Sequence, residues 1–165
     1  MSAPLPDPDQ MPLELLLRRA RREVEEDDPE APVPFLVAVQ QWPTREVFAY
    51  ATAFMHEDDP IKRVLGLRTL REIGAEQDDG RRPFTAETVP LLRARLRDEP
   101  DAGVLGWIVS ALGYHRAGEA LPEVLPLAGH PDDEVRMAVA WAITGMTDEF
   151  RAERLVTRWQ DQASH

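Results

Sequence analysis

Apolar residues recur at the spacing of a buried helical face through most of the chain. In the first such stretch they lie three or four positions apart, which predicts a helix over about 12–27. This stripe consists of Leu13, Leu16, Leu17, Ala20 and Val24. The same periodicity predicts further helices over 45–56, 61–73, from 85 onward, 102–114, 117–128, 132–145 and 149–160. No segment alternates between apolar and polar residues with period two, so we expect an all-α fold.

Proline, glycine and capping residues mark where these helices begin and end. Residues 1–10 combine prolines with polar residues and lack an apolar period, so we expect a disordered arm there. Thr44 is placed to cap the helix that follows it, and Gly74 is placed to end the helix that precedes it. A long loop with the turn signal of two aspartates and a glycine is expected over 75–84.

Three segments of the chain are similar to one another, which indicates an internal repeat. They begin at positions 62, 104 and 135 and cover 62–70, 104–112 and 135–143. Each follows an acidic corner that contains proline, and these corners are 58–60, 98–100 and 130–133. The first interval between copies is longer than the second because it includes the loop at 75–84. The repeating unit is therefore two helices and two turns.

The repeated residues resemble HEAT-like repeats, and in particular the short variety named after phycobilisome lyases. The resemblance rests on an acidic corner followed by a Val-Arg pair, and on Ala-Leu-Gly and Val-Pro-type junctions between helices. The matching residues are Val135-Arg136, Ala111-Leu112-Gly113, Thr88-Val89-Pro90 and Ala120-Leu121-Pro122. The likeness extends over about 59–160, and more loosely over 33–57. In the middle copy Leu105 stands where Arg63 and Arg136 stand in the other two, and in the first copy Lys62 replaces the Val, so an Asp-to-Arg ladder between repeats is expected to be broken in the middle copy.

The resemblance implies a short right-handed α-solenoid of antiparallel helix pairs (HEAT-like repeats). Each pair has an apolar face that it cannot bury alone, and stacking of neighbouring pairs completes the core. We expect one solenoid domain over 11–160, between the arm at 1–10 and a tail at 161–165. Within it we expect an N-terminal cap over 12–42 and repeats over about 43–97, 98–129 and 130–160, with the helix at 149–160 closing the C-terminal end.

The net charge and composition of the chain disfavour some kinds of binding partner and some locations. The chain has 165 residues, with 30 Asp and Glu against 19 Lys and Arg, and its net charge is -11. Such a charge disfavours nucleic acid and anionic membrane surfaces. There is no cysteine, and no apolar stretch approaches the length that spans a bilayer. Without a signal-like start, a cytoplasmic protein of bacterial type is the expectation.

The sequence offers little for catalysis or for metal binding. His56, His115, His130 and His165 are expected to be solvent-exposed turn residues, and no glycine-rich phosphate loop or Ser-His-Asp arrangement is evident. We therefore expect no catalytic, cofactor or metal site. The acidic corners are interpreted as helix caps, with an edge that receives a basic partner as the alternative.

Candidate partner-binding residues come from the repeat geometry. In HEAT-like arrays the second helix of each pair lines the concave face, and five positions are taken as candidates on this basis or from their exposure. The candidates are Trp141, Arg95, Glu123, Arg154 and Arg158. Trp141 aligns with the polar residues Arg68 and Ser110, so it is either an exposed binding anchor or packed against the helix at 149–160.

These observations favour a non-enzymatic scaffold or adaptor that binds a protein or peptide partner. The alternative is an enzyme or enzyme accessory of the bilin-lyase-like type, which the family name suggests. The identity of the partner, the oligomeric state and membership of a longer repeat array stay open.

Overall fold

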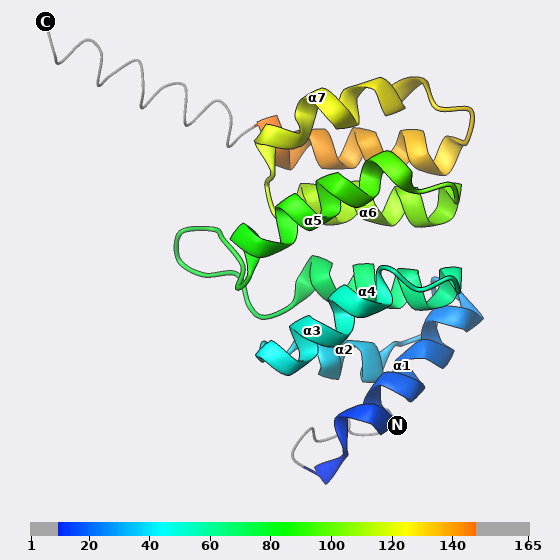
Figure 1. The fold of residues 1–165 in the computed structure, drawn as a ribbon, viewed down its shortest axis with the longest axis vertical. Helices are drawn as coiled ribbons and strands as arrows, with labels where there is room; N and C mark the ends of the chain where they lie inside the picture. Colours follow the sequence, from blue (N-terminus) through cyan, green and yellow to red (C-terminus); the bar gives the residue numbers. More distant parts are fainter. Residues whose placement is uncertain (1–9, 148–165) are drawn as a thin grey trace, which may run out of the picture. The chain divides into compact units, whose positions relative to one another are not determined.

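The computed structural model describes residues 10–147, and this part of the chain contains helices and no strands (Figure 1). The helices are α1 (Leu13–Glu26), α2 (Pro34–Gln40), α3 (Arg45–Phe54), α4 (Pro60–Glu72), α5 (Thr85–Asp98), α6 (Ala102–Tyr114) and α7 (Leu121–Val124), with the short 3₁₀ helices η2 (Gly118–Ala120) and η3 (Leu125–Gly129). A further helix covers 133–147, is drawn in orange at its end in Figure 1, and is called here the 133–147 helix. Within the first unit α3 and α4 lie antiparallel, and within the second unit α5 and α6 do (Figure 1). The expected all-α solenoid class is confirmed.

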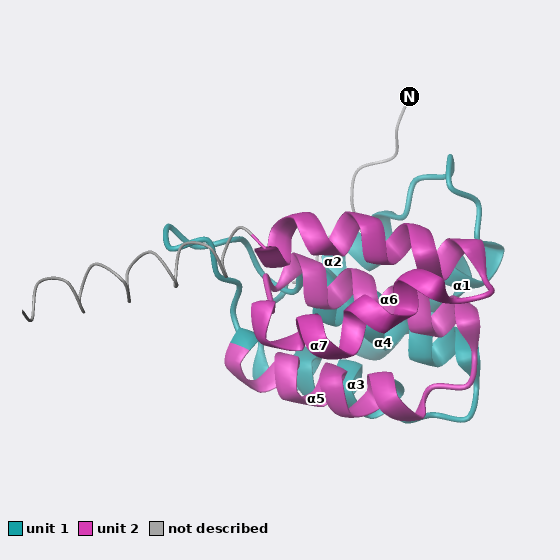
Figure 2. Ribbon diagram, turned by 90° about the horizontal axis from the view of Figure 1, so that it is seen from above, with its two compact units in different colours: residues 1–85 teal, residues 86–165 magenta. Residues whose placement is uncertain are grey.

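The chain divides into two compact units, residues 1–85 and residues 86–165 (Figure 2). In the first unit α1 packs on α2, and α4 contacts α1, α2 and α3. The second unit is built from α5, α6, the short helices around α7 and the 133–147 helix. The repeat boundaries expected within a single domain stay a prediction. The helix expected over 149–160 and residues 1–9 of the arm expected over 1–10 lie outside the described residues.

The core of the first unit follows the periodicity of its sequence. The five apolar residues that predict α1 are all buried. Glu23 on α1 also caps α2, because its two carboxylate oxygens accept hydrogen bonds from the backbone N–H groups of Phe35 and Leu36. The predicted cap of α3 is confirmed, since the hydroxyl of Thr44 accepts from the N–H of Val47. These contacts pair backbone donors that a helix start would otherwise leave unpaired.

Contacts at both ends of the loop over 75–84 hold it to the rest of the first unit. Gly74 begins it with φ of +73°, a left-handed conformation that favours glycine, and its N–H donates to the carbonyl of Gln40. At the other end the ring of Phe84 stacks on Phe48 with 4.7 Å between centroids. The guanidinium of Arg45 lies 4.9 Å from the Phe84 ring, so a cation–π contact adds to this anchor.

Acidic residues cap the helices that follow the three corners, as predicted for the first and third; in the middle one the cap is Asp101, one residue beyond the predicted corner 98–100. Asp59, Asp101 and Asp132 each accept a hydrogen bond at 2.9 Å from a backbone N–H two or three residues later. In two corners an arginine adds a second tie. Arg63 donates to the carbonyls six and five residues before it, and Arg136 does the same in its own corner. In the first and third corners, therefore, the Asp pairs a free backbone N–H group and the Arg pairs two backbone carbonyls.

The middle corner is closed differently, because Leu105 takes the place of the arginine. Here Glu99 accepts from the N–H of Asp101 and from the guanidinium of Arg95. Glu99 thus contributes to this corner by accepting hydrogen bonds, whereas the arginines of the other two corners donate to backbone carbonyls.

In the second unit α6 and the 133–147 helix approach each other through small residues. A Cβ placed on Gly113 would lie 2.7 Å from the Cα of Ala142, which is a forbidden distance. By contrast, a Cβ on Gly106 would lie 3.9 Å from the Cβ of Ala138. Small residues therefore set how closely the two helices pack. The buried face of the 133–147 helix consists of Val135, Val139, Ala142 and Met146.

The prediction of a single helix over 117–128 is wrong. This stretch consists of η2, α7 and η3 in succession, so only its centre is α-helical. Pro122 and Pro126 lack the N–H groups that would bond to the carbonyls four residues earlier. The chain tightens into 3₁₀ turns on either side of α7, a geometry common at interrupted helix ends.

Replacement of Gly113 by alanine tests the close approach of the two helices. We expect Gly113→Ala to lower the free energy of unfolding by about 1–3 kcal/mol, the usual cost of overpacking. The matched control is Gly106→Ala on the same helix, where the added methyl group has room and alanine favours the helix. Chemical denaturation followed by circular dichroism measures both, and equal stability of the two variants would contradict this packing.

The corner at Asp59 predicts a dependence of stability on pH. A hydrogen bond from Arg21, at 2.9 Å, holds the pKa of Asp59 below its ordinary value of 3.8. Since the pKa is lowered in the folded state, the stabilisation is present above the ordinary pKa and is lost as the pH falls through the lowered one.

The substitution Asp59→Asn keeps a capping residue but removes the charge. We expect it to cost up to about 1 kcal/mol at neutral pH, because the pair is partly exposed. The difference from the parent should shrink below pH 4, and denaturation at several acidic pH values measures it. A constant difference across that range would show that the ion pair does not cause it.

Candidate protein-binding surface

Exposed apolar side chains gather in the second unit. Among residues 10–147, the large hydrophobic residues that are exposed are Tyr114, Leu125, Met137 and Trp141. The two most exposed are Trp141, at 78%, and Met137, at 60%. They lie four residues apart on the 133–147 helix, so they share one face of it.

This face lies opposite the buried one, and Ala140 and Thr144 are exposed beside the two large residues. We define the Met137–Trp141 face as Met137, Ala140, Trp141 and Thr144. Large exposed apolar residues on one face of a helix are typical of a surface that binds another protein.

The equivalent positions in the preceding copy of the repeat lie where two helices pack. Met137 and Trp141 occupy the positions that Gly106 and Ser110 occupy in α6. On α6 that side receives the next helix, since Gly106 faces Ala138. The Met137–Trp141 face is therefore the repeat equivalent of a helix-packing surface, and in the 133–147 helix it carries large side chains instead of small ones.

Two of the predicted binding residues are engaged in ion pairs within the second unit. Arg95 pairs with Glu99, whose side chain is 0% exposed. Glu123, on α7, accepts hydrogen bonds from Arg93 and Arg97 of α5. Glu123 thus joins α7 to α5, whereas Arg95 binds a residue of the corner that directly follows its own helix. Arg154 and Arg158 lie outside the described residues.

The surroundings of Glu123 favour its charged form. Its partial burial on its own would raise the pKa of the carboxyl, but the hydrogen bond from Arg93 and the nearby charge of that arginine outweigh this effect. The pKa of Glu123 therefore lies below its ordinary value. The carboxylate stays ionised and holds α7 to α5 over the physiological range.

Met137 is a candidate that the sequence reasoning missed. The sequence carried a signal for it, because Met137 aligns with Gly106 of the preceding copy and stands one helical turn before Trp141. A large side chain where the preceding copy has glycine indicates that the close packing on that side of α6 is not repeated there.

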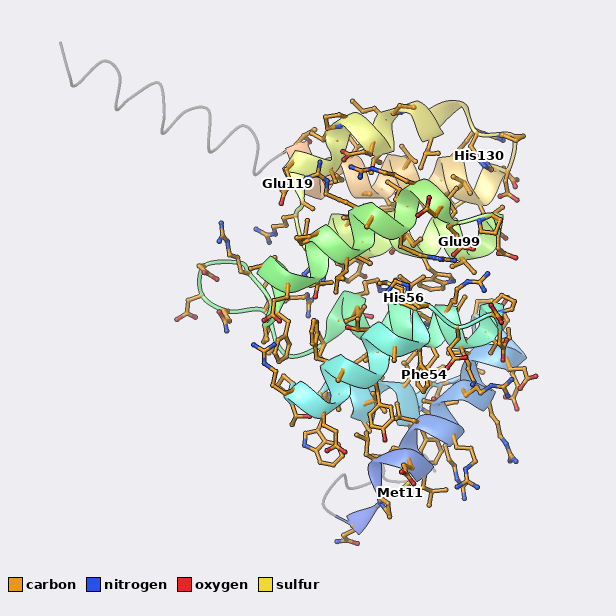
Figure 3. The ribbon with its side chains drawn as sticks, viewed as in Figure 1. Met11, Phe54, His56, Glu99, Glu119 and His130 are labelled. Carbon is orange, nitrogen blue, oxygen red and sulfur yellow. The ribbon has the colours of Figure 1, made fainter. Side chains whose placement is uncertain are left out.

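The prediction for the histidines needs one correction. His56 is exposed, and His130 is partly exposed at the corner before the 133–147 helix, where Figure 3 labels it. His115, however, is only 5% exposed. It ends α6, and its backbone N–H donates to the carbonyl of Ala111, so the helix end holds it within the unit. His165 lies outside the described residues.

The Nδ1 atom of His130 accepts from the N–H of Asp132 at 3.1 Å, which gives this histidine a structural role in its corner. Between residues 10 and 147, no group of three or more His, Asp or Glu side chains is arranged to hold a metal ion. Over the same range, none of the helices combines the length and the apolar character that crossing a bilayer requires.

Comparison with known proteins supports a HEAT-like repeat protein. The family model for HEAT repeats matches residues 89–165, a range that includes α6, α7 and the Met137–Trp141 face. Neither a search of curated proteins nor a search of solved structures found a match. The likeness to the phycobilisome-lyase variety stays a prediction.

The two ion pairs of α5 are expected to differ in their effect on stability. Arg95→Ala leaves the buried carboxylate of Glu99 without its arginine, and we expect it to lower the free energy of unfolding by about 1–3 kcal/mol. Arg97→Ala is the matched control on the same helix, since Arg97 is well exposed and Glu123 keeps Arg93. We expect the control to change stability by less than about 0.5 kcal/mol. Urea denaturation compares the two, and an equal loss would contradict the structural role of Arg95.

Proposed function

We propose that this protein is a non-enzymatic scaffold that binds a protein or peptide partner, and that the Met137–Trp141 face is its main anchor. The observation that carries the proposal is the exposure of a tryptophan and a methionine on one helix of a HEAT-like repeat region. HEAT-like repeats commonly serve as interaction scaffolds, and the expected location of this one is the cytoplasm.

The chemistry of the face suits a protein partner. Tryptophan and methionine are enriched where proteins meet, and tryptophan in particular provides a large contact area with few rotatable bonds. The net charge of -11 disfavours a nucleic acid or an anionic membrane as the partner. A partner with an apolar segment is therefore the better fit.

The remaining predicted residues have two different parts in this proposal. Arg95 and Glu123 maintain the shape of the second unit through their ion pairs. Arg154 and Arg158, which lie outside the described residues, stay candidates for direct contact with the partner.

Trp141→Ala tests the anchor. The tagged full chain is used to capture partners from the lysate of its host, and a captured protein is then purified and titrated by calorimetry. We expect Trp141→Ala to weaken binding about 30-fold or more, because a central tryptophan contributes at least about 2 kcal/mol. Circular dichroism should show an unchanged fold, since the side chain is exposed.

Tyr114→Ala is the matched control, as it removes an exposed aromatic ring at the end of α6. We expect it to retain affinity within about threefold of the parent. Equal affinity of Trp141→Ala and the parent would exclude the Met137–Trp141 face as the anchor. If no protein binds the parent directly, the scaffold proposal fails.

A further inference from the structure

A helix covers the side of α6 that corresponds to the Met137–Trp141 face. A Cβ on Gly106 would lie 3.9 Å from the Cβ of Ala138. Further along α6, a Cβ on Gly113 would lie 2.7 Å from the Cα of Ala142. Because the residue numbers rise together along both helices, α6 and the 133–147 helix run in the same direction. The Met137–Trp141 face therefore occupies the position at which stacked repeats add one more helix, parallel to the last.

The part of the chain that the structure describes has no strand to which an extended peptide could pair. Extended peptides gain much of their affinity from backbone hydrogen bonds to a sheet edge, whereas an amphipathic helix binds through its apolar side chains. Met137 and Trp141 offer side chains alone and lie one helical turn apart. They match a partner helix whose apolar residues recur three or four positions apart, so the geometry favours a helical segment.

Two acidic side chains flank the start of this face. Asp133 and Glu134 stand four and three positions before Met137, so they lie one turn before it on the same side of the helix. Both are exposed, and within residues 10–147 neither forms an ion pair. Arg136 beside them donates to two backbone carbonyls of the preceding corner. Carboxylates at this end favour a partner that carries positive charge next to its apolar residues.

We propose that the partner presents an amphipathic helix, which packs on the Met137–Trp141 face parallel to the 133–147 helix. A lysine or arginine in the first turn of that helix lies beside Asp133 and Glu134. A second copy of this chain fits less well, because two molecules that each carry a net charge of -11 repel one another. This binding mode rests on the proposed function, and it specifies the conformation, direction and charge of the segment that binds.

A library of displayed random peptides serves as the probe. Peptides of about 20 residues are long enough to form a helix on binding. They are selected on the full chain after depletion on Trp141→Ala, so the retained peptides depend on the anchor. We expect the retained sequences to carry apolar residues at helical spacing, with lysine or arginine enriched in the turn that precedes them.

One retained peptide is then synthesised and titrated by calorimetry against the charge-neutralised variant, Asp133→Asn with Glu134→Gln. We expect its affinity to fall about fivefold at low salt, because each exposed ion pair contributes modestly, and to fall less at high salt, which screens the charges. The matched control is Glu26→Gln with Glu30→Gln, which removes the same charge from exposed positions of the first unit. Its affinity should stay within about twofold of the parent. Circular dichroism shows whether each variant keeps its fold.

The direction of the helix is tested with a second synthetic peptide, in which the basic residues move from the first turn to the last. Parallel packing places them beyond the reach of Asp133 and Glu134. We expect this peptide to bind the parent about fivefold more weakly than the first peptide does, and to bind the charge-neutralised variant as well as it binds the parent. Circular dichroism of the free peptides measures their helix contents, for which the affinities are corrected.

Retained peptides without helical spacing, or a selection in which no peptide depends on Trp141, would overturn the proposal. Equal losses of affinity in the charge-neutralised variant and its control would also overturn it. If the parent self-associates in sedimentation experiments and Trp141→Ala does not, the face binds a second copy instead. A captured protein that binds at Trp141 through an extended segment would overturn the helical mode and leave the scaffold proposal intact. Failure to capture any protein counts against the scaffold proposal, whereas the peptide measurements stand apart from it.

Discussion

The backbones of α6 and the 133–147 helix come as close as they do because glycine stands at position 113 and alanine at position 142. A helix pair of this kind has no independent core, so the packing of each helix depends on the side chains that its neighbour presents. Small residues on one side of α6 let the next helix approach, and the buried valines of that helix then complete the unit. The same dependence explains the exposed residues. Met137 and Trp141 stand where α6 has the small residues Gly106 and Ser110, and this surface is left for a different kind of contact.

The corners between helices contain the polar side chains that pair the backbone groups at the helix starts. Each stacking helix must begin where the chain turns sharply, and its first N–H groups need acceptors. An aspartate provides one in all three copies, and in two of them an arginine on the following turn binds the corner carbonyls. The middle copy has no such arginine, and there a buried glutamate accepts hydrogen bonds from the N–H of Asp101 and from Arg95. Apolar stacking and corner closure are therefore separate requirements, met by separate residues of the repeat.

Local features of the sequence were sufficient to predict much of the fold. The stripe of α1 and the caps at Thr44 and Gly74 depend only on nearby residues, and the structure has them as expected. The helix over 117–128 failed because two prolines remove donors that periodicity does not count. At the site, alignment with polar residues indicated that Trp141 could be exposed. The pairing of Glu123 with α5 was not predictable, because it depends on how two helices meet in space.

The corners closed by arginine bear on how repeats of this kind can be duplicated or lost in evolution. In each, the corner carbonyls and the helix start are paired with side chains from within about seven positions, and at the first corner Arg21 pairs with Asp59 in addition. A gene segment that encodes such a corner and its helix can be duplicated or lost without leaving unpaired backbone groups behind. Growth by duplication needs only a compatible apolar face on the next copy. Local self-sufficiency at the corners is thus what makes the number of copies free to vary in evolution.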